Sequence, residues 1–106
     1  MKIYIAGKIS GEDRAACTMK FGTAQKAIED LGQEAINPLE VVGDWNTTWE
    51  NAMRKCIAAM MAADAVLFLP DTNDSKGAKI ERSLALKLGI KRIYSFQELK
   101  LIISQS

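Results

Sequence analysis

Glu81 is the residue of this chain whose surroundings in the sequence most strongly suggest chemistry. Residues 77–88 repeat apolar side chains at helical spacing, and Glu81 falls near the middle of the apolar face of that helix. A lone carboxylate is costly to bury, so it needs a partner or a function there. The alternative is an exposed glutamate that complements the dipole at the start of the helix. Because the apolar face argues against exposure, we prefer a functional carboxylate.

Polar residues directly before this helix extend the candidate site. The apolar and β-branched run 65–69 predicts a strand that leads into a polar loop carrying Asp71, Asp74 and Ser75. Parallel sheets bind ligands at the carboxyl ends of their strands, where a helix N-terminus offers free N–H groups. These three residues are therefore candidates for ligand contact. Asp64 precedes the strand, at the opposite edge, and we expect it to be a turn or cap residue.

A second candidate loop follows the first predicted strand, 2–6, and Gly7 and Gly11 frame it. Glycine allows backbone N–H groups to approach an anion closely. The spacing matches neither the dinucleotide-binding fingerprint nor the P-loop. The loop alone therefore indicates a binding site only weakly.

Two further features allow competing interpretations. Cys56 shares an apolar helix face with Trp49 and Met53, so a buried thiol is preferred over a nucleophile. Trp45 lies in the segment 39–46, which has no regular pattern and is expected to be a loop. Its ring could cover a flat ligand or could pack under its own loop.

Composition limits the classes of protein that need to be considered. The 106 residues suit one domain, 1–106, and the formal net charge of +1 gives no reason to expect nucleic acid or a membrane surface as a partner. No histidine is present, which excludes a histidine-based triad, a histidine-ligated metal site and a zinc finger. We expect no metal and no cofactor. Without a signal peptide or membrane span, we expect a cytoplasmic protein.

Strands and helices alternate along the predicted chain. The strands are expected at 2–6, 34–37, 65–69 and 91–94, and the helices at 12–31, 48–63 with Thr47 as N-cap, 77–88 and 96–104. Right-handed crossovers then give a flavodoxin-like three-layer α/β/α sandwich with a four-stranded parallel sheet in the order 2-1-3-4. The switch point between the first and third strands brings the glycine loop and the loop before Glu81 together.

Two motifs, IYIAGKISG at 3–11 and SKGAKIE at 75–81, resemble the nucleoside 2-deoxyribosyltransferase superfamily. That superfamily includes the 2'-deoxynucleoside 5'-monophosphate N-glycosidases. Asn37 followed by Pro38, and Trp49 four residues before Met53, are similar to a small branch of it found in bacteria and phages. The resemblance extends over nearly the whole chain. It implies the same α/β fold and a small-molecule nucleotide or nucleoside as partner.

The resemblance also implies roles for individual residues. Glu81 matches the nucleophilic carboxylate of the family, Tyr4 the tyrosine that holds it, and Ser75 the serine that binds the 5'-phosphate in the glycosidases. A carboxylate beneath the anomeric carbon stabilises an oxocarbenium-like state or forms a covalent glycosyl intermediate. The other expected substrate contacts are Gly7, Lys8, Ile9, Ser10, Gly11, Asp71, Gly77 and Ala78.

One departure from the family pattern divides the functional hypotheses. The active glycosidases carry an aspartate that assists the departing base, and its position here falls near Cys56; Asp71 or Asp74 could take its role. The leading hypothesis is hydrolysis or transfer at the N-glycosidic bond of a (deoxy)nucleoside 5'-monophosphate. A catalytically inactive nucleotide-binding domain is the alternative, and a purely structural domain is a third. A homodimer or higher homo-oligomer is implied by the resemblance alone.

Overall fold

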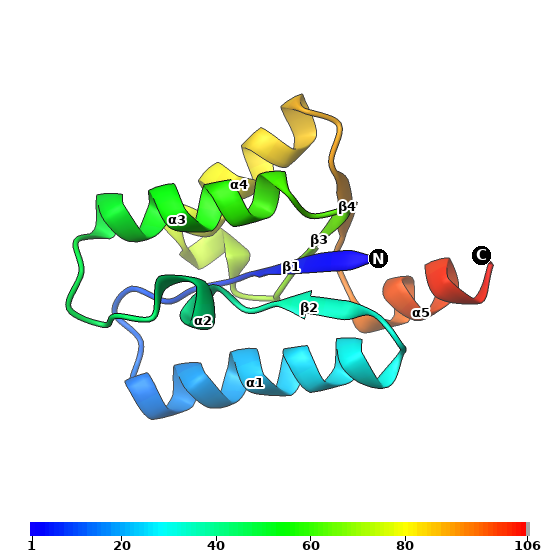
Figure 1. The fold of residues 1–106 in the computed structure, drawn as a ribbon, viewed down its shortest axis with the longest axis horizontal. Coiled ribbons are helices and arrows are strands. Elements are labelled where there is room, and N and C mark those ends of the chain that lie inside the picture. The colour runs from blue at the N-terminus through cyan, green and yellow to red at the C-terminus, as the bar shows by residue number, and fades with distance from the viewer. Residues whose placement is uncertain (106) are drawn as a thin grey trace.

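Four parallel strands form one sheet in the order β2-β1-β3-β4 in the computed structural model, which describes residues 1–105 (Figure 1). They are β1 (Lys2–Ala6), β2 (Glu34–Ile36), β3 (Ala65–Phe68) and β4 (Lys91–Ile93). The predicted α/β class, the parallel sheet and the 2-1-3-4 order are confirmed. The central strands β1 and β3 form because short apolar, β-branched runs bury best when they are hydrogen-bonded on both sides, whereas β2 and β4 are edge strands that pair on one side.

Strand β1 lies in the middle of the sheet and divides the core into two halves. It pairs with β3 from Ile3 opposite Ala65 to Ala6 opposite Phe68. Alternate side chains of a strand point to opposite faces. Ile3 and Ile5 consequently join one buried cluster, and Tyr4 and Ala6 join the other.

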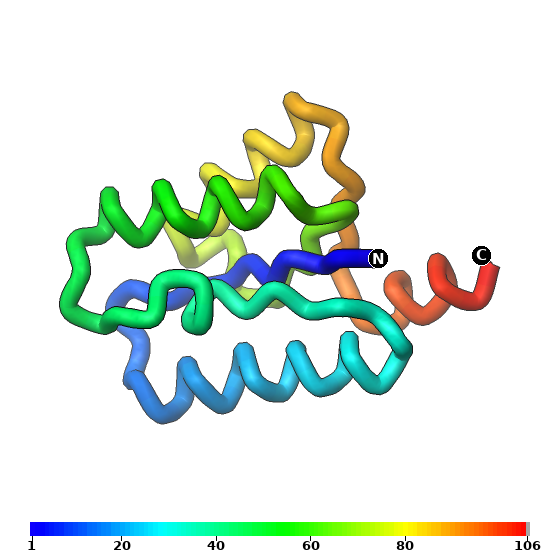
Figure 2. The backbone as a smooth tube through the Cα atoms, in the orientation of Figure 1, coloured from blue at the N-terminus to red at the C-terminus, as the bar shows by residue number. Residues whose placement is uncertain are grey.

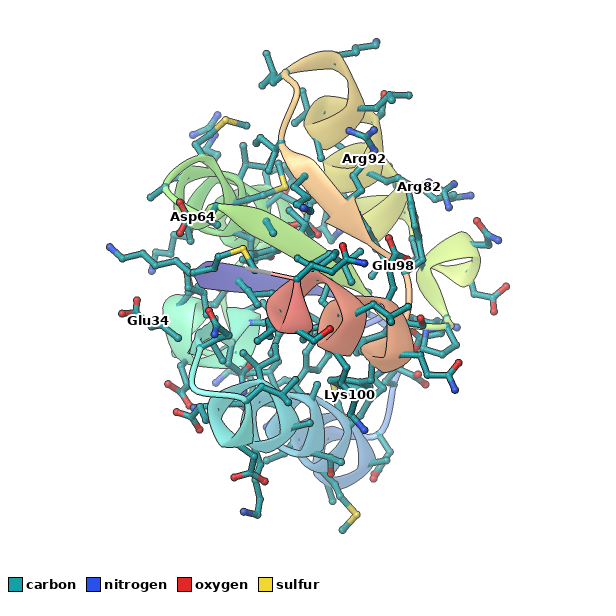
Figure 3. All side chains as sticks on the ribbon, turned by 90° about the vertical axis from the view of Figure 1, so that its right-hand side faces the viewer. Glu34, Asp64, Arg82, Arg92, Glu98 and Lys100 are labelled. Atoms are coloured by element: carbon teal, nitrogen blue, oxygen red, sulfur yellow. The ribbon has the colours of Figure 1, made fainter. Side chains whose placement is uncertain are left out.

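Helices cover both faces of the sheet and complete the three layers (Figures 1 and 3). Helices α1 (Arg14–Asp30) and α5 (Phe96–Ser104) pack on the face of Ile3 and Ile5. Helices α3 (Trp49–Met61) and α4 (Lys76–Lys87) pack on the face of Tyr4 and Ala6. Tyr4 therefore points toward α3 and α4, the side on which Glu81 lies.

The segment expected to be an irregular loop begins with a short helix, α2 (Pro38–Val42). The prediction was wrong there because it overlooked the local capping signals. The Asn37 side chain accepts a hydrogen bond from the Leu39 N–H at 2.9 Å, and Pro38 occupies the first turn, where a missing N–H costs nothing. Gly43 ends the helix in a left-handed conformation, with φ of 68°.

The N-terminus of α3 also differs from the prediction by one residue. Thr48, not Thr47, is the N-cap, and its Oγ1 accepts the Asn51 backbone N–H at 3.1 Å. The Thr47 hydroxyl oxygen instead accepts from the Asn51 side-chain amide at 3.1 Å. The two adjacent threonines thus both bond Asn51, which fixes where the helix begins.

At the amino edge of the sheet, polar residues join strand ends to their neighbours (Figure 3). Asp64 Oδ2 accepts the Lys2 backbone N–H at 2.7 Å, which agrees with its expected role in a turn. Arg92 donates to the Ile90 carbonyl at 3.0 Å, just before β4. Within residues 1–105, no helix is both long and apolar enough to cross a membrane.

Candidate active site

A cavity of about 450 Å³ opens at the carboxyl edge of the sheet, opposite Asp64. Its walls are the loop after β1, the segment from α2 to α3, one face of α3 and the start of α4. Figure 2 traces the connections that follow β1 and α2 to this same end of the molecule. The volume suits a small organic ligand of nucleotide size. The two loops that the sequence predicted to meet do line one cavity.

Glu81 lines this cavity and has 4% of its surface exposed. Helix α4 carries it on the face that packs toward the sheet, where Ala78 and Ala85 are also buried. Desolvation by burial raises the pKa of Glu81 to about 7, although a hydrogen bond from Tyr4 acts in the opposite direction. At neutral pH the side chain therefore exchanges readily between its ionised and protonated forms.

Tyr4 holds this carboxylate directly. Its hydroxyl donates to Glu81 Oε2 at 2.6 Å, between residues that are 77 positions apart in the sequence. Desolvation, followed by the nearby Glu81 charge, raises the pKa of Tyr4 well above its ordinary value, so the hydroxyl remains a proton donor. The hydrogen bond fixes the orientation of the carboxylate toward the cavity.

Cys56 completes the surroundings of this pair. Its side chain is 4% exposed and lines the cavity from α3. Desolvation raises the pKa of the thiol; interaction with Tyr4 lowers it and the Glu81 charge raises it again. A thiol with a raised pKa is neutral and a poor nucleophile. The structure thus places Cys56 both in the core, as preferred from the sequence, and at the cavity wall.

Ser75 and the start of α4 form one side of the cavity. Ser75 is the N-cap: its Oγ accepts the Ala78 N–H at 3.1 Å. The amides of Lys76 and Gly77 precede the first intrahelical hydrogen bonds of the helix, as in any α-helix. With the Ser75 hydroxyl proton, they provide donors and a positive dipole end, which suit an anion.

Gly77 allows α3 and α4 to approach each other at this wall. A Cβ atom at Gly77 would lie 2.8 Å from Met53 Sδ and 3.9 Å from Trp49 Nε1. The position therefore tolerates no side chain unless Met53 moves. Close packing of the two helices, rather than a turn, explains this glycine.

The predicted glycine loop also borders the cavity, through Gly7, Lys8, Ile9, Ser10 and Gly11. Gly11 requires its residue type because its φ is 81°. Gly7 has a different reason: a Cβ there would lie 2.9 Å from Leu69 Cδ1 and 3.2 Å from Asp71 Oδ1. The first glycine makes room for the neighbouring loop rather than for a ligand.

Asp71 was expected to contact substrate, but the structure places it outside the cavity lining. Its Oδ1 accepts the Lys8 N–H at 3.0 Å, and its Oδ2 pairs with Lys20 Nζ at 2.6 Å. Burial tends to raise the pKa of Asp71, yet these hydrogen bonds lower it below the ordinary value. Asp71 thus holds the two loops together. Its neighbour Asp74 does line the cavity.

Sequence reasoning did not identify Lys20 as part of the site. The pair with Asp71 spans 51 positions, so no local pattern in the sequence could have revealed it. Only the adjacency of β1 and β3, which the strand order predicted, indicates that the two loops meet. Opposite charges near those two strand ends are the signal in the sequence that indicates such a pair.

Cations and aromatic rings form the rim. Arg14 Cζ lies 5.4 Å from the centroid of the Trp45 ring, and Lys76 Nζ lies 4.4 Å from the centroid of the Trp49 ring. Trp45 is 42% exposed and borders the cavity, so it does not pack beneath its own loop. Flat rings and positive side chains at one rim suit a ligand with both a planar apolar part and an anionic group.

The chain is similar to one known family in sequence and to a solved structure in fold. The family model described as a domain of unknown function (DUF4406) matches residues 1–94. No curated protein matches the chain in sequence. A solved structure of a 2-deoxyribosyltransferase from the psychrotolerant bacterium Bacillus psychrosaccharolyticus aligns with a TM-score of 0.67 at 20% identity, over 87% of this chain and 69% of that chain. At that identity the likeness establishes a common fold.

Proposed function

The chain belongs to the DUF4406 family, and from its fold and cavity we propose that it cleaves or transfers at the N-glycosidic bond of a (deoxy)nucleoside 5'-monophosphate. One observation carries the proposal: a buried carboxylate, Glu81, faces a cavity of nucleotide size and is oriented by Tyr4 at 2.6 Å. Burying a carboxylate costs free energy. Attraction to a substrate whose transition state gains positive charge offsets that cost. The likeness in fold to a 2-deoxyribosyltransferase supports the same reaction class.

In the proposed reaction, a Glu81 oxygen bonds to the anomeric carbon while the bond from that carbon to the base nitrogen breaks. The electron pair leaves with the base nitrogen, which takes up a proton from solvent water or from an acidic side chain of the cavity wall. Water then displaces Glu81 and gives the free sugar phosphate, or a second base displaces it and completes a transfer. Ser75 and the first amides of α4 hold the phosphate, and the rim near Trp45 and Trp49 receives the base.

The ionised form of Glu81 is the reactive one, which makes the reaction depend on pH. Because the pKa of Glu81 is about 7, this side chain is ionised in only a fraction of the protein molecules at neutral pH. We expect kcat/KM to rise with pH and to level off above pH 7.

A second candidate function is nucleotide binding without turnover. Cys56 favours it, because a neutral thiol lies near Glu81 at the position where the glycosidases that the sequence resembles carry an acid. The one carboxylate of α3 is Glu50, and it does not line the cavity. Asp74, which lines the cavity next to Ser75, is a carboxylate that could protonate a departing base. Binding without release of base is the distinguishing outcome.

The test is release of free base, measured by chromatography, from the four common deoxynucleoside 5'-monophosphates. Wild type is compared with Glu81→Gln, which keeps the size of the side chain, and with Glu29→Gln, which removes an exposed carboxylate of α1. We expect release by wild type and Glu29→Gln and at least about a 1,000-fold loss in Glu81→Gln. Equal release by Glu81→Gln would refute the role of Glu81. If the proteins bind the nucleotides and none of the three releases base, the second candidate, nucleotide binding without turnover, is established.

A further inference from the structure

One ion pair holds both polar groups of the Lys8 backbone. Asp71 Oδ1 accepts the Lys8 N–H at 3.0 Å, and Lys20 Nζ donates to the Lys8 carbonyl at 2.7 Å. Asp71 Oδ2 and Lys20 Nζ close the ring at 2.6 Å. Two side chains from separate segments, Asp71 and Lys20, therefore fix a single residue of the glycine loop.

This ring determines the direction of the next peptide. Lys20 belongs to α1, on the face of the sheet opposite Glu81, and it does not line the cavity. The Lys8 carbonyl consequently points toward the α1 face. The chain contains no cis peptide in the part described, and in a trans peptide the N–H points opposite to the C=O. The Ile9 N–H is therefore directed toward the cavity side.

We propose that the Asp71–Lys20 pair is a positioning device that turns the Lys8–Ile9 peptide so that its N–H donates to an oxygen of the bound sugar phosphate. This inference rests on the proposed function, which supplies the ligand. Asp71 and Lys20 do not touch the ligand; they act through the peptide. Since the acceptor is either a phosphate oxygen or a sugar hydroxyl, the experiment includes ligands with and without phosphate.

Pairing also keeps an unfavourable charge away from the ligand. Asp71 lies directly behind the loop, and its carboxylate alone would repel a phosphate. About a quarter of each side chain is exposed, so water screens the pair only partly. Burial tends to lower the pKa of Lys20 but the bond to Asp71 raises it overall, which keeps the ammonium charged at neutral pH. The ring therefore presents a donor to the cavity while the Asp71 carboxylate stays paired with Lys20, which also contacts Glu12 Oε1 at 3.3 Å.

The test follows the Ile9 amide by ¹H–¹⁵N NMR while each of the four deoxynucleoside 5'-monophosphates, and then the corresponding nucleosides, is titrated into the protein. Wild type is compared with Lys20→Met, Lys20→Arg and Asp71→Asn. Lys26→Met is the control, because Lys26 lies on the same helix and pairs with the exposed Asp30, with Nζ 3.4 Å from Oδ2. Melting temperatures show that each variant is folded, and Asp71→Asn replaces Lys20→Met if the latter does not fold.

We expect the Ile9 amide to shift on binding in wild type, and the affinity to fall about 3- to 10-fold in Lys20→Met, the effect of one lost hydrogen bond. Lys20→Arg should keep an affinity close to that of wild type, and Lys26→Met should match wild type. A shift that needs the 5'-phosphate assigns the acceptor to phosphate, and one that persists with nucleosides assigns it to the sugar. Binding without an Ile9 shift, or unchanged affinity in Lys20→Met and Asp71→Asn, overturns this inference but not the proposed function. Absence of binding by wild type to every ligand overturns both.

Discussion

Replacing Glu81 by glutamine should stabilise the protein in a way that depends on pH. Glu81 has a pKa of about 7 in the folded chain, against 4.5 as its ordinary value. Since 1.36 kcal/mol corresponds to one pKa unit, ionisation of this one carboxyl costs the folded state about 3 kcal/mol. The cost is absent below pH 4.5, grows between pH 4.5 and 7, and is constant above pH 7, because a raised pKa means that the folded state holds its proton longer.

Glutamine does not ionise, so the free-energy cost of the buried charge disappears in Glu81→Gln. We expect the difference in unfolding free energy between Glu81→Gln and wild type to increase by about 3 kcal/mol from pH 4.5 to pH 8. The comparison at two pH values cancels the pH-independent effect of placing an amide beside Tyr4. Subtracting wild type from the variant at each pH also cancels the contribution of other carboxylates, such as Asp71, whose lowered pKa acts in the opposite direction.

Urea unfolding at pH 4.5, 6 and 8, followed by the fluorescence of Trp45 and Trp49, measures these free energies. Glu29→Gln, an exposed substitution of the same chemistry, should change stability by less than about 0.5 kcal/mol at every pH. A difference between Glu81→Gln and wild type that stays constant from pH 4.5 to 8 would refute the reasoning, because the ionised carboxylate would then be as well solvated as in the unfolded chain.

Two further substitutions test the geometry around Glu81. Tyr4→Phe removes the hydrogen bond that lowers the pKa of Glu81, so a carboxyl ¹³C titration should place that pKa above 7; an unchanged or lower pKa would contradict the assigned role of the Tyr4 hydroxyl. Gly77→Ala puts a Cβ 2.8 Å from Met53 Sδ and forces the thioether to move. Alanine favours the helix by about 1 kcal/mol, which offsets this strain, so the melting temperature should change little while nucleotide affinity falls at least about 3-fold. Gly77→Ala combined with Met53→Ala should restore the affinity, and a single variant that binds like wild type would show that the wall there does not meet the ligand.

Much of the fold was predictable because the signals are local or repeat regularly. Apolar runs indicate β1 and β3, and right-handed crossovers leave few orders for four parallel strands. The prediction failed where one side chain decides between alternatives. Asn37 and Pro38 together begin α2, and Thr48 rather than Thr47 caps α3, although the two threonines are chemically identical.

The candidate site was predictable to the extent that burial conflicts with residue type. Glu81 on an apolar face shows such a conflict within the sequence itself. Asp71 does not, because an aspartate after a strand is compatible with binding a ligand or with bonding another loop. Its partner Lys20 is distinguished from other helix lysines only by three-dimensional proximity, since the two are 51 positions apart.

The central place of β1 has a consequence for synthesis of the chain. As a ribosome adds residues in order, β1 can pair early with β2, but its other edge remains open until β3 has emerged some 60 positions later. The Tyr4 hydroxyl lacks its hydrogen-bond partner for longer still, because Glu81 follows it by 77 positions. A nascent chain of half length thus exposes an unpaired strand edge that can associate with other chains. A chaperone that shields this edge would protect the part of the protein on which the site is later assembled.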